Sequence, residues 1–283
     1  MRILITGASG FLGSNLVNHF PEHDIFPVYF NKPIKNGWCC NLEMLDSVKY
    51  LCNKIKPEVI IHCAANPNPK HPSNVVDMLN SNVLTTLNLL ESIPEESTFV
   101  FISSIGVYGD LYPIECPTSL YGATKLCSEQ LIVPYMKLKG IKRRIVRPCA
   151  IVGKHTTHGL LFDLKRKLLS DSKELELFGN CPGTRKPFIH VDELCEYIKS
   201  RIEIQESDEA GDTVDAGPSD NASVEEIANA AMEVMNIYKP IKWLGSGAIW
   251  KGDNMELKYD NIFCTLDRFI PKMSSIEAIK NAF

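Results

Sequence analysis

The chain has 283 residues, of which 45% are hydrophobic, and a formal net charge of −4 at pH 7. This length suits one large α/β domain, or a large domain that carries a smaller lobe. The mildly acidic balance, with a pI near 6.0, provides no basic stripe of the kind that neutralises nucleic-acid phosphates. A nucleic-acid-binding role is therefore not expected.

The N-terminal residues MRILITG lead directly into an apolar strand and a glycine turn, without the pattern of a signal peptide. The sequence contains no run of about 18 apolar residues, so no membrane segment is expected. The 10 cysteines are scattered, with only Cys39 and Cys40 close together. Because no CxxC pair occurs, no metal site is predicted. We expect reduced, mostly buried thiols in a cytoplasmic protein.

Short apolar runs alternate with amphipathic segments over the first half of the chain. These runs predict strands at residues 2–6, 25–30, 58–63, 98–103 and 142–147. The segments between them predict helices at residues 11–20, 44–55, 75–92 and 119–139. This alternation indicates a Rossmann-like, doubly wound parallel sheet, which we place in an NAD(P)-binding domain over residues 1–148.

The alternation weakens after residue 148. A helix is predicted near residues 160–169, and a short apolar run follows at 175–178. Two serine–glutamate pairs fit the capping box that begins a helix, Ser223 with Glu226 and Ser274 with Glu277. We expect residues 149–283 to form mainly a smaller α+β substrate-binding lobe, with some segments returning to the first domain.

Three glycines, Gly7, Gly10 and Gly13, lie between the first predicted strand and the first predicted helix. Gly7 permits a tight turn, Gly10 lets the backbone approach a pyrophosphate, and Gly13 lets helix and strand pack closely. The helix N-terminus offers free amides and a positive dipole to the phosphates. The motif therefore predicts a dinucleotide cofactor.

The second predicted strand ends in VYFNKP, which has no carboxylate at Asn31 or Lys32 to bind a ribose 2′-hydroxyl. Lys32 could instead meet the 2′-phosphate of NADP as a point charge. The alternative is a solvated loop lysine. We therefore expect NAD(P), with a slight preference for NADP.

Tyr121 and Lys125 are four positions apart on a predicted helix, which places their side chains on one face. A lysine cation beside a tyrosine favours the phenolate, so the pair could exchange a proton with an alcohol while a nicotinamide moves hydride. Ser103 and Ser104 end the preceding strand, where a hydroxyl can orient the reacting oxygen. Alternatively these serines satisfy loop amides, which is favoured for Ser103.

Several motifs occur in the order in which one known family has them: GASGFLG, HCAA, NVLTTLNLLES, SSIGVYG, YGATK, RPCAIVG and RKPFIHVDEL. Through them, nearly the whole chain resembles the extended short-chain dehydrogenase/reductase family, in its nucleotide-sugar epimerase, dehydratase and 4-ketoreductase branch. The resemblance implies that Ser104 is the catalytic hydroxyl, that Tyr121 is the acid/base and that Lys125 holds the nicotinamide ribose.

The resemblance also implies further contacts. Those to the cofactor are Phe11, Leu12, Asn41, Leu42, Ala64, Ala65, Asn82 and Cys149. Those to the substrate are Arg185, at the position of a diphosphate contact, and His158, near a second acid/base position. A guanidinium suits a diphosphate because its planar fork binds oxygens bidentately.

The chain departs from the family pattern at several positions. Ile105 and Gly106 follow Ser104 where dehydratases carry an Asp-Glu pair, and Gly106 also replaces a cysteine of the epimerase-reductases. The interval from Ser104 to Tyr121 is short, with a loop around 112–117. Other substrate-side departures are Ala150 in place of an asparagine and Trp250 with Lys251 ahead of Gly252 and Asp253.

These departures disfavour dehydration. We therefore expect an NAD(P)-dependent nucleotide-sugar epimerase or 4-ketoreductase. The alternatives are an NADPH-dependent reductase of a non-nucleotide carbonyl and a cofactor-binding regulatory subunit. The resemblance further implies a homodimer that pairs the helices predicted at 75–92 and 119–139.

Overall fold

The computed structural model describes residues 1–67, 75–109, 111, 113–156, 159–203, 212–245 and 267–283. The chain forms two compact units. The first comprises Met1–Pro148, Cys195–Asp215 and Thr265–Arg268. The second comprises Cys149–Leu194, Ala216–Cys264 and Phe269–Phe283.

The first unit is built on an 8-stranded sheet with the order β14-β11-β6-β5-β4-β1-β2-β3. Its strands are β1 (Arg2–Thr6), β2 (Asp24–Tyr29), β3 (Trp38–Cys39), β4 (Val59–His62), β5 (Thr98–Ile102), β6 (Lys142–Pro148), β11 (Asp212–Ala216) and β14 (Asp267–Phe269). The six neighbouring strands β6, β5, β4, β1, β2 and β3 pair in parallel. This order is that of a doubly wound fold, which confirms the predicted Rossmann-like class.

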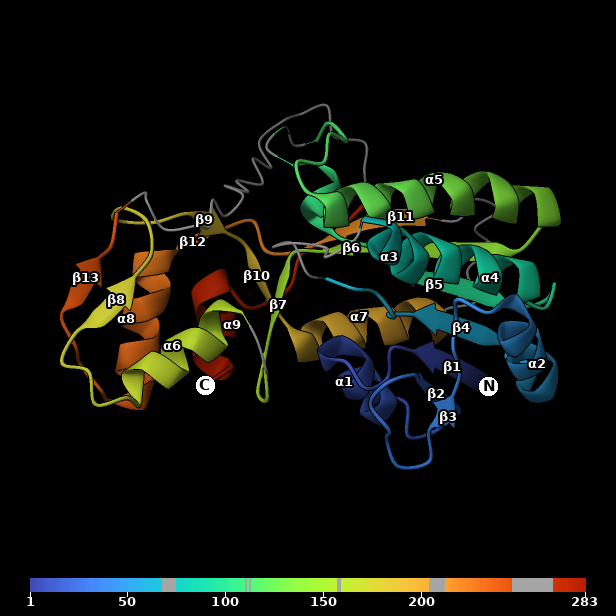
Figure 1. Ribbon diagram of the computed structural model, residues 1–283, viewed down its shortest axis with the longest axis horizontal. Coiled ribbons are helices and arrows are strands. Elements are labelled where there is room, and N and C mark those ends of the chain that lie inside the picture. Colours follow the sequence, from blue (N-terminus) through green and yellow to red (C-terminus); the bar gives the residue numbers. More distant parts are fainter. Residues whose placement is uncertain (68–74, 110, 112, 157–158, 204–211, 246–266) are drawn as a thin grey trace. The chain divides into compact units, whose positions relative to one another are not determined.

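Helices cover both faces of this sheet, with α4 and α5 on one side and α1 and α7 on the other (Figure 1). The helical elements are α1 (Phe11–His19), α2 (Leu45–Ile55), α3 (Val75–Leu79), α4 (Thr85–Ser92), α5 (Leu120–Lys139) and α7 (Val191–Glu203). The helical segment predicted at 75–92 is confirmed, and a π-helical turn, η1 (Asn80–Leu84), lies within it between α3 and α4. A 3-10 turn, η2 (Ile105–Val107), follows β5.

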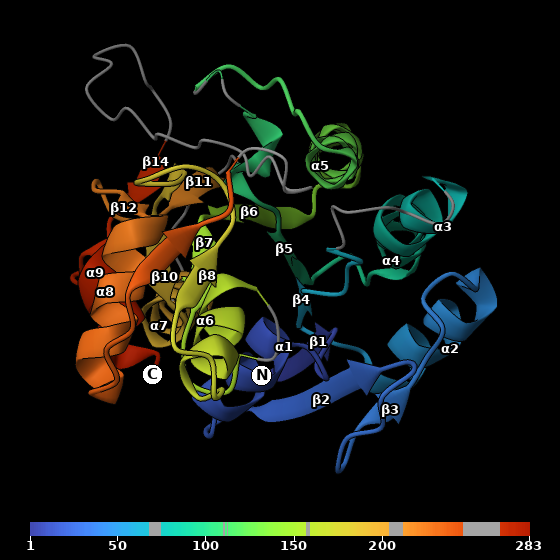
Figure 2. The same cartoon turned by 60° about the vertical axis from the view of Figure 1, so that its left-hand side comes forward.

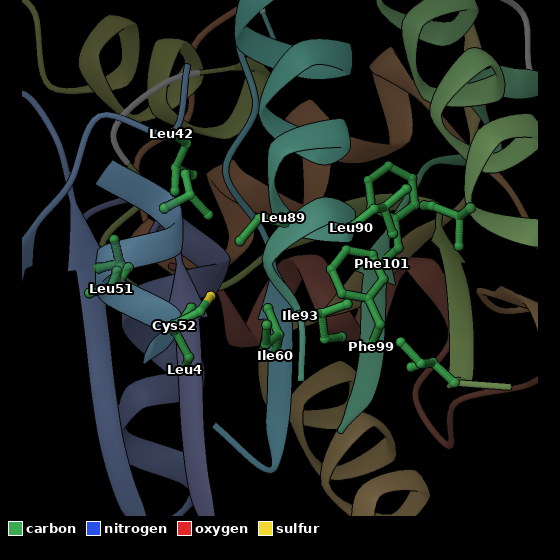
Figure 3. Close-up of a cluster of buried hydrophobic side chains, with 14 of the residues drawn as sticks. Leu4, Leu42, Leu51, Cys52, Ile60, Leu89, Leu90, Ile93, Phe99 and Phe101 are labelled. Atoms are coloured by element: carbon green, nitrogen blue, oxygen red, sulfur yellow. The ribbon is translucent and has the colours of Figure 1, made fainter. Parts of the chain in front are cut away.

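Apolar strands form the centre of the core. Ile3, Leu4 and Ile5 are each 0% exposed, so both faces of β1 are covered, as parallel strands require. Figure 3 shows Leu4, Ile60, Phe99 and Phe101 of the strands packed with Leu51 and Cys52 of α2 and Leu89 and Leu90 of α4. Burying this continuous apolar surface is the main stabilising contribution of the unit.

Within its described residues, the second unit contains three short strand pairs and three helices. Figure 2 shows these elements from a second side. The pairs are β7 (Ala150–Val152) with β10 (Phe188–His190), β9 (Arg185–Lys186) with β12 (Ala222–Ser223), and β8 (Leu175–Leu177) with β13 (Ile241–Trp243). The helices are α6 (Leu160–Leu168), α8 (Val224–Met235) and α9 (Ser275–Asn281). Both predicted capping boxes are confirmed, at the starts of α8 and α9.

The cysteines are less buried than expected. Among the described cysteines, those exposed are Cys39, Cys116, Cys127 and Cys181. They lie on an edge strand, in loops or on the outward face of α5, so the expectation of mostly buried thiols is wrong. Within the ranges that the structure describes, no helix combines the length and hydropathy needed to cross a bilayer.

Candidate functional site

The glycine turn between β1 and α1 is shaped by close backbone contacts. Gly7 has φ +66°, and a Cβ there would lie 2.7 Å from the Ala64 amide nitrogen. A Cβ on Gly13 would lie 2.3 Å from the Gly7 carbonyl oxygen, so α1 packs directly on the strand end. The N-cap of α1, Gly10, offers no side-chain hydrogen bond, and the first turn holds no acidic residue. Such a helix start fits a phosphate group.

A groove of about 530 Å³ opens beside this turn, at the carboxyl ends of β1, β2 and β4. The predicted cofactor residues that line it are Gly7, Gly10, Lys32, Asn41, Leu42, Ala64 and Ala65. The lining residues that were not predicted as contacts include Ser9, Tyr29, Phe30, Cys40, Glu43, Cys63, Asn66, Pro67, Ser81 and Thr85. The groove lies where the strand order reverses, between β1 and β4, which is where doubly wound folds bind ligands.

Other predicted cofactor residues lie outside the lining of the groove. Leu12 is buried in the first turn of α1, and Phe11 beside it is half-buried. Cys149 belongs to the second unit, where it is buried and its amide donates to the Ala216 carbonyl at 2.9 Å. Phe11 and Leu12 therefore lie in the first turn of α1, whereas Cys149 lies in the other unit. The cofactor contacts of all three residues stay predictions.

The three residues expected to be catalytic lie in the first unit. Ser104 Oγ accepts a hydrogen bond from the Gly106 amide at 3.0 Å, as the N-cap of η2. Lys125, 3% exposed, donates from Nζ to the Ile102 carbonyl at 2.7 Å. Its Nζ lies 5.8 Å from the centroid of the Tyr121 ring. The lysine therefore joins the end of β5 to the helix that carries Tyr121.

The hydrogen bonds of the two serines differ from the alternative in which Ser103 satisfies a loop amide. Ser104, rather than Ser103, accepts from a loop amide. The Ser103 hydroxyl instead donates to the carboxylate of Glu129. The reason is that Ser103 still belongs to the buried end of the sheet, where a carboxylate is the available acceptor.

Two glycines bring the segments of Ser104 and Tyr121 together. A Cβ on Gly122 would lie 2.2 Å from the Gly106 carbonyl oxygen, and a Cβ on Gly106 would lie 3.8 Å from Gly122 Cα. The backbone two residues after Ser104 therefore touches the backbone one residue after Tyr121. From the sequence, Gly106 was considered only as the replacement of a cysteine, and Gly122 was not singled out. The glycine of YGATK could have indicated a close backbone contact beside Tyr121.

Burial controls the protonation of the pair. It raises the pKa of Tyr121 to about 12. It also lowers the pKa of Lys125 to about 8, although the nearby Glu129 carboxylate acts in the opposite direction. The expected lowering of the Tyr121 pKa by Lys125 is therefore wrong for this arrangement, because the ammonium is directed to the Ile102 carbonyl and the loss of hydration dominates.

A buried histidine underlies the groove. The Ala64 amide donates to Thr6 Oγ1 at 3.2 Å, which leaves the Thr6 hydroxyl to donate to His62 Nδ1 at 2.7 Å. On the other side, His62 Nε2 lies 3.1 Å from Thr86 Oγ1. Because the Thr86 hydroxyl donates to the Asn82 carbonyl at 2.8 Å, His62 Nε2 is the donor in that pair. Burial, followed by the Lys125 charge, lowers the pKa of His62 to about 3, so the ring is neutral.

Asn82, within the π-helical turn, links the groove to α5. Its Oδ1 accepts from the Asn66 amide at 2.7 Å, and its Nδ2 donates to Thr124 Oγ1 at 2.9 Å and to the Asn66 carbonyl at 3.2 Å. The side chain is thus occupied by protein partners. It backs the groove wall, and the wider helical turn accompanies this anchoring.

The substrate-side predictions lie in the second unit or outside the described residues. Arg185 Nη2 donates to the Asn221 carbonyl at 3.0 Å and lies 3.1 Å from Glu226 Oε2. His158, with the departures at 250–253, lies outside the described residues. Arg185 is therefore already engaged by a carboxylate.

Comparison with known proteins decides the family. The model of the NAD dependent epimerase/dehydratase family matches residues 3–217. The chain belongs to this family. This confirms the resemblance seen in the motifs, and it makes the chain an NAD(P)-dependent enzyme of the extended short-chain dehydrogenase/reductase type.

Three similar proteins illustrate the range of the family. The GDP-6-deoxy-D-talose 4-dehydrogenase of Aggregatibacter actinomycetemcomitans is 30% identical over 215 residues, which cover 70% of this chain and 69% of the relative. The methionine adenosyltransferase 2 subunit beta of Xenopus laevis is 32% identical over 142 residues, covering 47% of this chain and 42% of that protein. A crystal structure of the UDP-glucuronic acid 4-epimerase of Bacillus cereus, in complex with UDP-glucuronic acid and NAD, matches with a TM-score of 0.81 at 20% identity. The match covers 100% of this chain and 98% of the epimerase chain.

We predict that Gly122→Ala lowers turnover at least about tenfold, because the added methyl group would push α5 away from the Gly106 carbonyl and overpacking displaces the backbone. Initial rates with a nucleotide sugar and NAD(P) measure this effect. Ala123→Ser, on the exposed adjacent position, is the control that changes the same helix turn without this contact. Equal rates for Gly122→Ala and Ala123→Ser would contradict the prediction.

We also predict that His62 contributes to the dependence of stability on pH. The folded protein keeps His62 neutral down to a pH near 3, whereas the unfolded chain binds the proton near the ordinary value of 6.5. The contribution is therefore complete above pH 6.5 and is lost as the pH falls, at about 1.4 kcal/mol per pH unit. Urea unfolding of wild type and His62→Gln between pH 6.5 and 5 compares the two slopes, and parallel slopes would refute this role.

Proposed function

We propose that the chain is an NAD(P)-dependent nucleotide-sugar epimerase or 4-ketoreductase in which Tyr121 is the proton-transfer residue. The observation that carries this proposal is the Gly106–Gly122 contact, which holds the Ser104 turn against the Tyr121 turn beside buried Lys125. The activities named for the talose 4-dehydrogenase and the UDP-glucuronic acid 4-epimerase support oxidation or reduction at a sugar C4 carbon.

The residues at the groove fit a dinucleotide. The start of α1 at Gly10 would hold the pyrophosphate, and the Lys125 ammonium would hold the nicotinamide ribose. When bound, the nicotinamide supplies a hydride acceptor or donor. No further protein group need act on hydride, so the remaining work of this chain is to bind, orient and move a proton.

Proton transfer then falls to Tyr121. In the oxidative direction Tyr121, as the phenolate, would take the proton of the sugar C4 hydroxyl, while a bound nicotinamide would supply the hydride acceptor, so that the sugar is left as its C4 ketone. With a pKa near 12, Tyr121 is a proton donor and needs a nearby positive charge to become a base. The Lys125 ammonium, released from the Ile102 carbonyl, and an oxidised nicotinamide would both supply it. Ser104 would orient the C4 oxygen.

The direction of the last step separates the two forms of this function. In an epimerase Tyr121 would return the proton to the C4 oxygen of the same sugar after hydride addition to the other face, and the cofactor would not be consumed. In a net reductase Tyr121 would protonate the C4 oxygen of an incoming keto sugar, and a reduced cofactor would be consumed. Gly106 in place of the catalytic cysteine of the epimerase-reductases supports a single proton-transfer residue.

Two alternatives rest on particular observations. The ion pair between Arg185 and Glu226 occupies the guanidinium proposed for a diphosphate, which favours a reductase of a non-nucleotide carbonyl. The similarity to the methionine adenosyltransferase 2 subunit beta favours a cofactor-binding regulatory subunit. Turnover on UDP-, GDP- and dTDP-hexoses distinguishes the main proposal from both.

We predict that Tyr121→Phe retains the fold and the cofactor affinity but loses at least about a hundredfold in turnover, the scale for removal of a positioned acid/base. Lys125→Ala should weaken both cofactor binding and turnover, because the ammonium serves both. Calorimetry and initial rates measure the two effects. Near-normal turnover of Tyr121→Phe, with an unchanged thermal melt, would remove Tyr121 from the chemistry.

NADP(H) should bind at least as tightly as NAD(H). Lys32 lines the groove with Asn31, and neither residue carries the negative charge that would repel a 2′-phosphate. Titration calorimetry of wild type and Lys32→Ala with both cofactors tests this expectation. Tenfold tighter NAD(H) binding that Lys32→Ala leaves unchanged would reject the preference.

The protein should be a homodimer that pairs α3–α4 and α5 with their copies in a second chain. Three apolar side chains of α3 support this proposal, with exposures of 49% for Val75, 55% for Val76 and 43% for Leu79. Light scattering at micromolar concentration measures the mass. A monomer there would exclude this pairing, and Val76→Asp should convert a dimer of this kind to monomers.

A further inference from the structure

A buried arginine lies next to the proposed catalytic residues without belonging to them. Arg147, near the end of β6, is 3% exposed. Its Nε donates to both carboxylate oxygens of Glu129, at 3.0 and 3.1 Å, and Glu129 is 2% exposed. Its Nη1 donates to the Tyr108 hydroxyl at 2.6 Å. Its Nη2 contacts the carboxylates of both Glu129 and Glu115.

The partners of Arg147 flank the residues that carry the proposed chemistry. The Ser103 hydroxyl donates to Glu129, and its amide donates to the Val146 carbonyl at 2.7 Å, so the residue just before Ser104 is fixed from two sides. Tyr108 ends η2, the turn that Ser104 caps, and its hydroxyl donates to Asp215 at 2.8 Å. The guanidinium therefore holds both ends of the Ser104 turn.

The same guanidinium holds the helix that carries Tyr121. Glu129 is on α5 eight positions after Tyr121, about two helical turns away and on the same side of the helix. Glu115 lies in the loop that joins η2 to this helix. One side chain thus connects β6, the Ser104 turn, the following loop and α5.

We propose that Arg147, through Glu129 and Tyr108, is a positioning residue that sets the separation between the Ser104 and Tyr121 hydroxyl groups. The inference rests on the proposed function, since it concerns the geometry of those two groups. Arg147 contacts neither hydroxyl, so it acts only through its partners. A planar fork is needed, because a lysine ammonium cannot reach Glu129, Glu115 and Tyr108 in fixed directions at once.

The fork also explains why these charges tolerate burial. A carboxylate as buried as Glu129 is costly unless it is paired and hydrogen-bonded, and here Arg147 and Ser103 satisfy it. The Gly106–Gly122 contact fixes how closely the two segments approach. The Arg147 hub, which consists of Arg147, Glu129, Glu115 and Tyr108, fixes how the two segments are oriented about that contact.

The test compares Arg147→Lys with Arg144→Lys. Arg144 is on the same strand and is paired with Asp212 at 3.1 Å, a partner outside the Arg147 hub. Both variants keep the charge and lose a guanidinium. We measure the Tm, the NAD affinity, and kcat and KM with UDP-glucose, GDP-mannose and dTDP-glucose. Net reduction of NAD(P) is followed at 340 nm, and C4 epimerisation is followed by chromatography of the nucleotide sugars. Crystal structures of the NAD complexes give the distance between Ser104 Oγ and Tyr121 Oη.

Arg147→Lys should lower kcat at least about tenfold while KM and NAD affinity stay within about twofold, because misplacement by about 1 Å is costly to catalysis. The hydroxyl distance should change in Arg147→Lys and stay constant in Arg144→Lys. The double variant Arg147→Met/Glu129→Leu should recover Tm relative to Arg147→Met alone, since no buried charge is left unpaired, but should not recover kcat.

Two results would overturn the inference. One is a kcat that returns together with Tm in the double variant, which would make the hub a purely structural element. The other is a hydroxyl distance in Arg147→Lys that matches wild type. If wild type neither epimerises any of the three nucleotide sugars at C4 nor reduces NAD(P) with them, the proposed function fails, and the crystallographic distances still decide the role of Arg147.

Discussion

The candidate site depends on one close backbone contact, between the carbonyl of Gly106 and the α-carbon of Gly122. No side chain larger than hydrogen fits at Gly122, because its Cβ would lie 2.2 Å from the Gly106 oxygen. This contact joins the turn after β5 to the first turn of α5. Ser104 and Tyr121 come from these two turns, so the contact brings their segments side by side although 16 residues separate them in the sequence.

Burial then determines the charge state of the groups around this contact. Lys125 is 3% exposed, and the loss of hydration lowers its pKa to about 8. Burial raises the pKa of Tyr121 to about 12. His62 is kept neutral between two threonine hydroxyls. The positive charge available to an anionic dinucleotide would therefore come from Lys125, from Lys32 in the lining of the groove and from the start of α1.

The sequence predicted the elements that periodicity and caps define. Strand 2–6 matches β1, and the capping boxes at Ser223 and Ser274 begin α8 and α9. The π-helical turn at Asn82 has no local sequence signal, and the side chain of Asn82 hydrogen-bonds Thr124, 42 positions away. The Arg147 hub was missed for a similar reason. Its arginine, glutamates and tyrosine follow no local spacing and converge only through the strand order.

In the proposed mechanism, Tyr121 becomes a base only when a positive charge is added beside it. Tyrosinate absorbance near 295 nm, with Tyr121→Phe subtracted, measures the pKa of this one side chain with and without NAD. We expect a value near 12 in the free protein and a clear fall, of at least about two pH units, in the complex with oxidised cofactor. A pKa that stays near 12 in the NAD complex would contradict the assignment of Tyr121 as the proton-transfer residue.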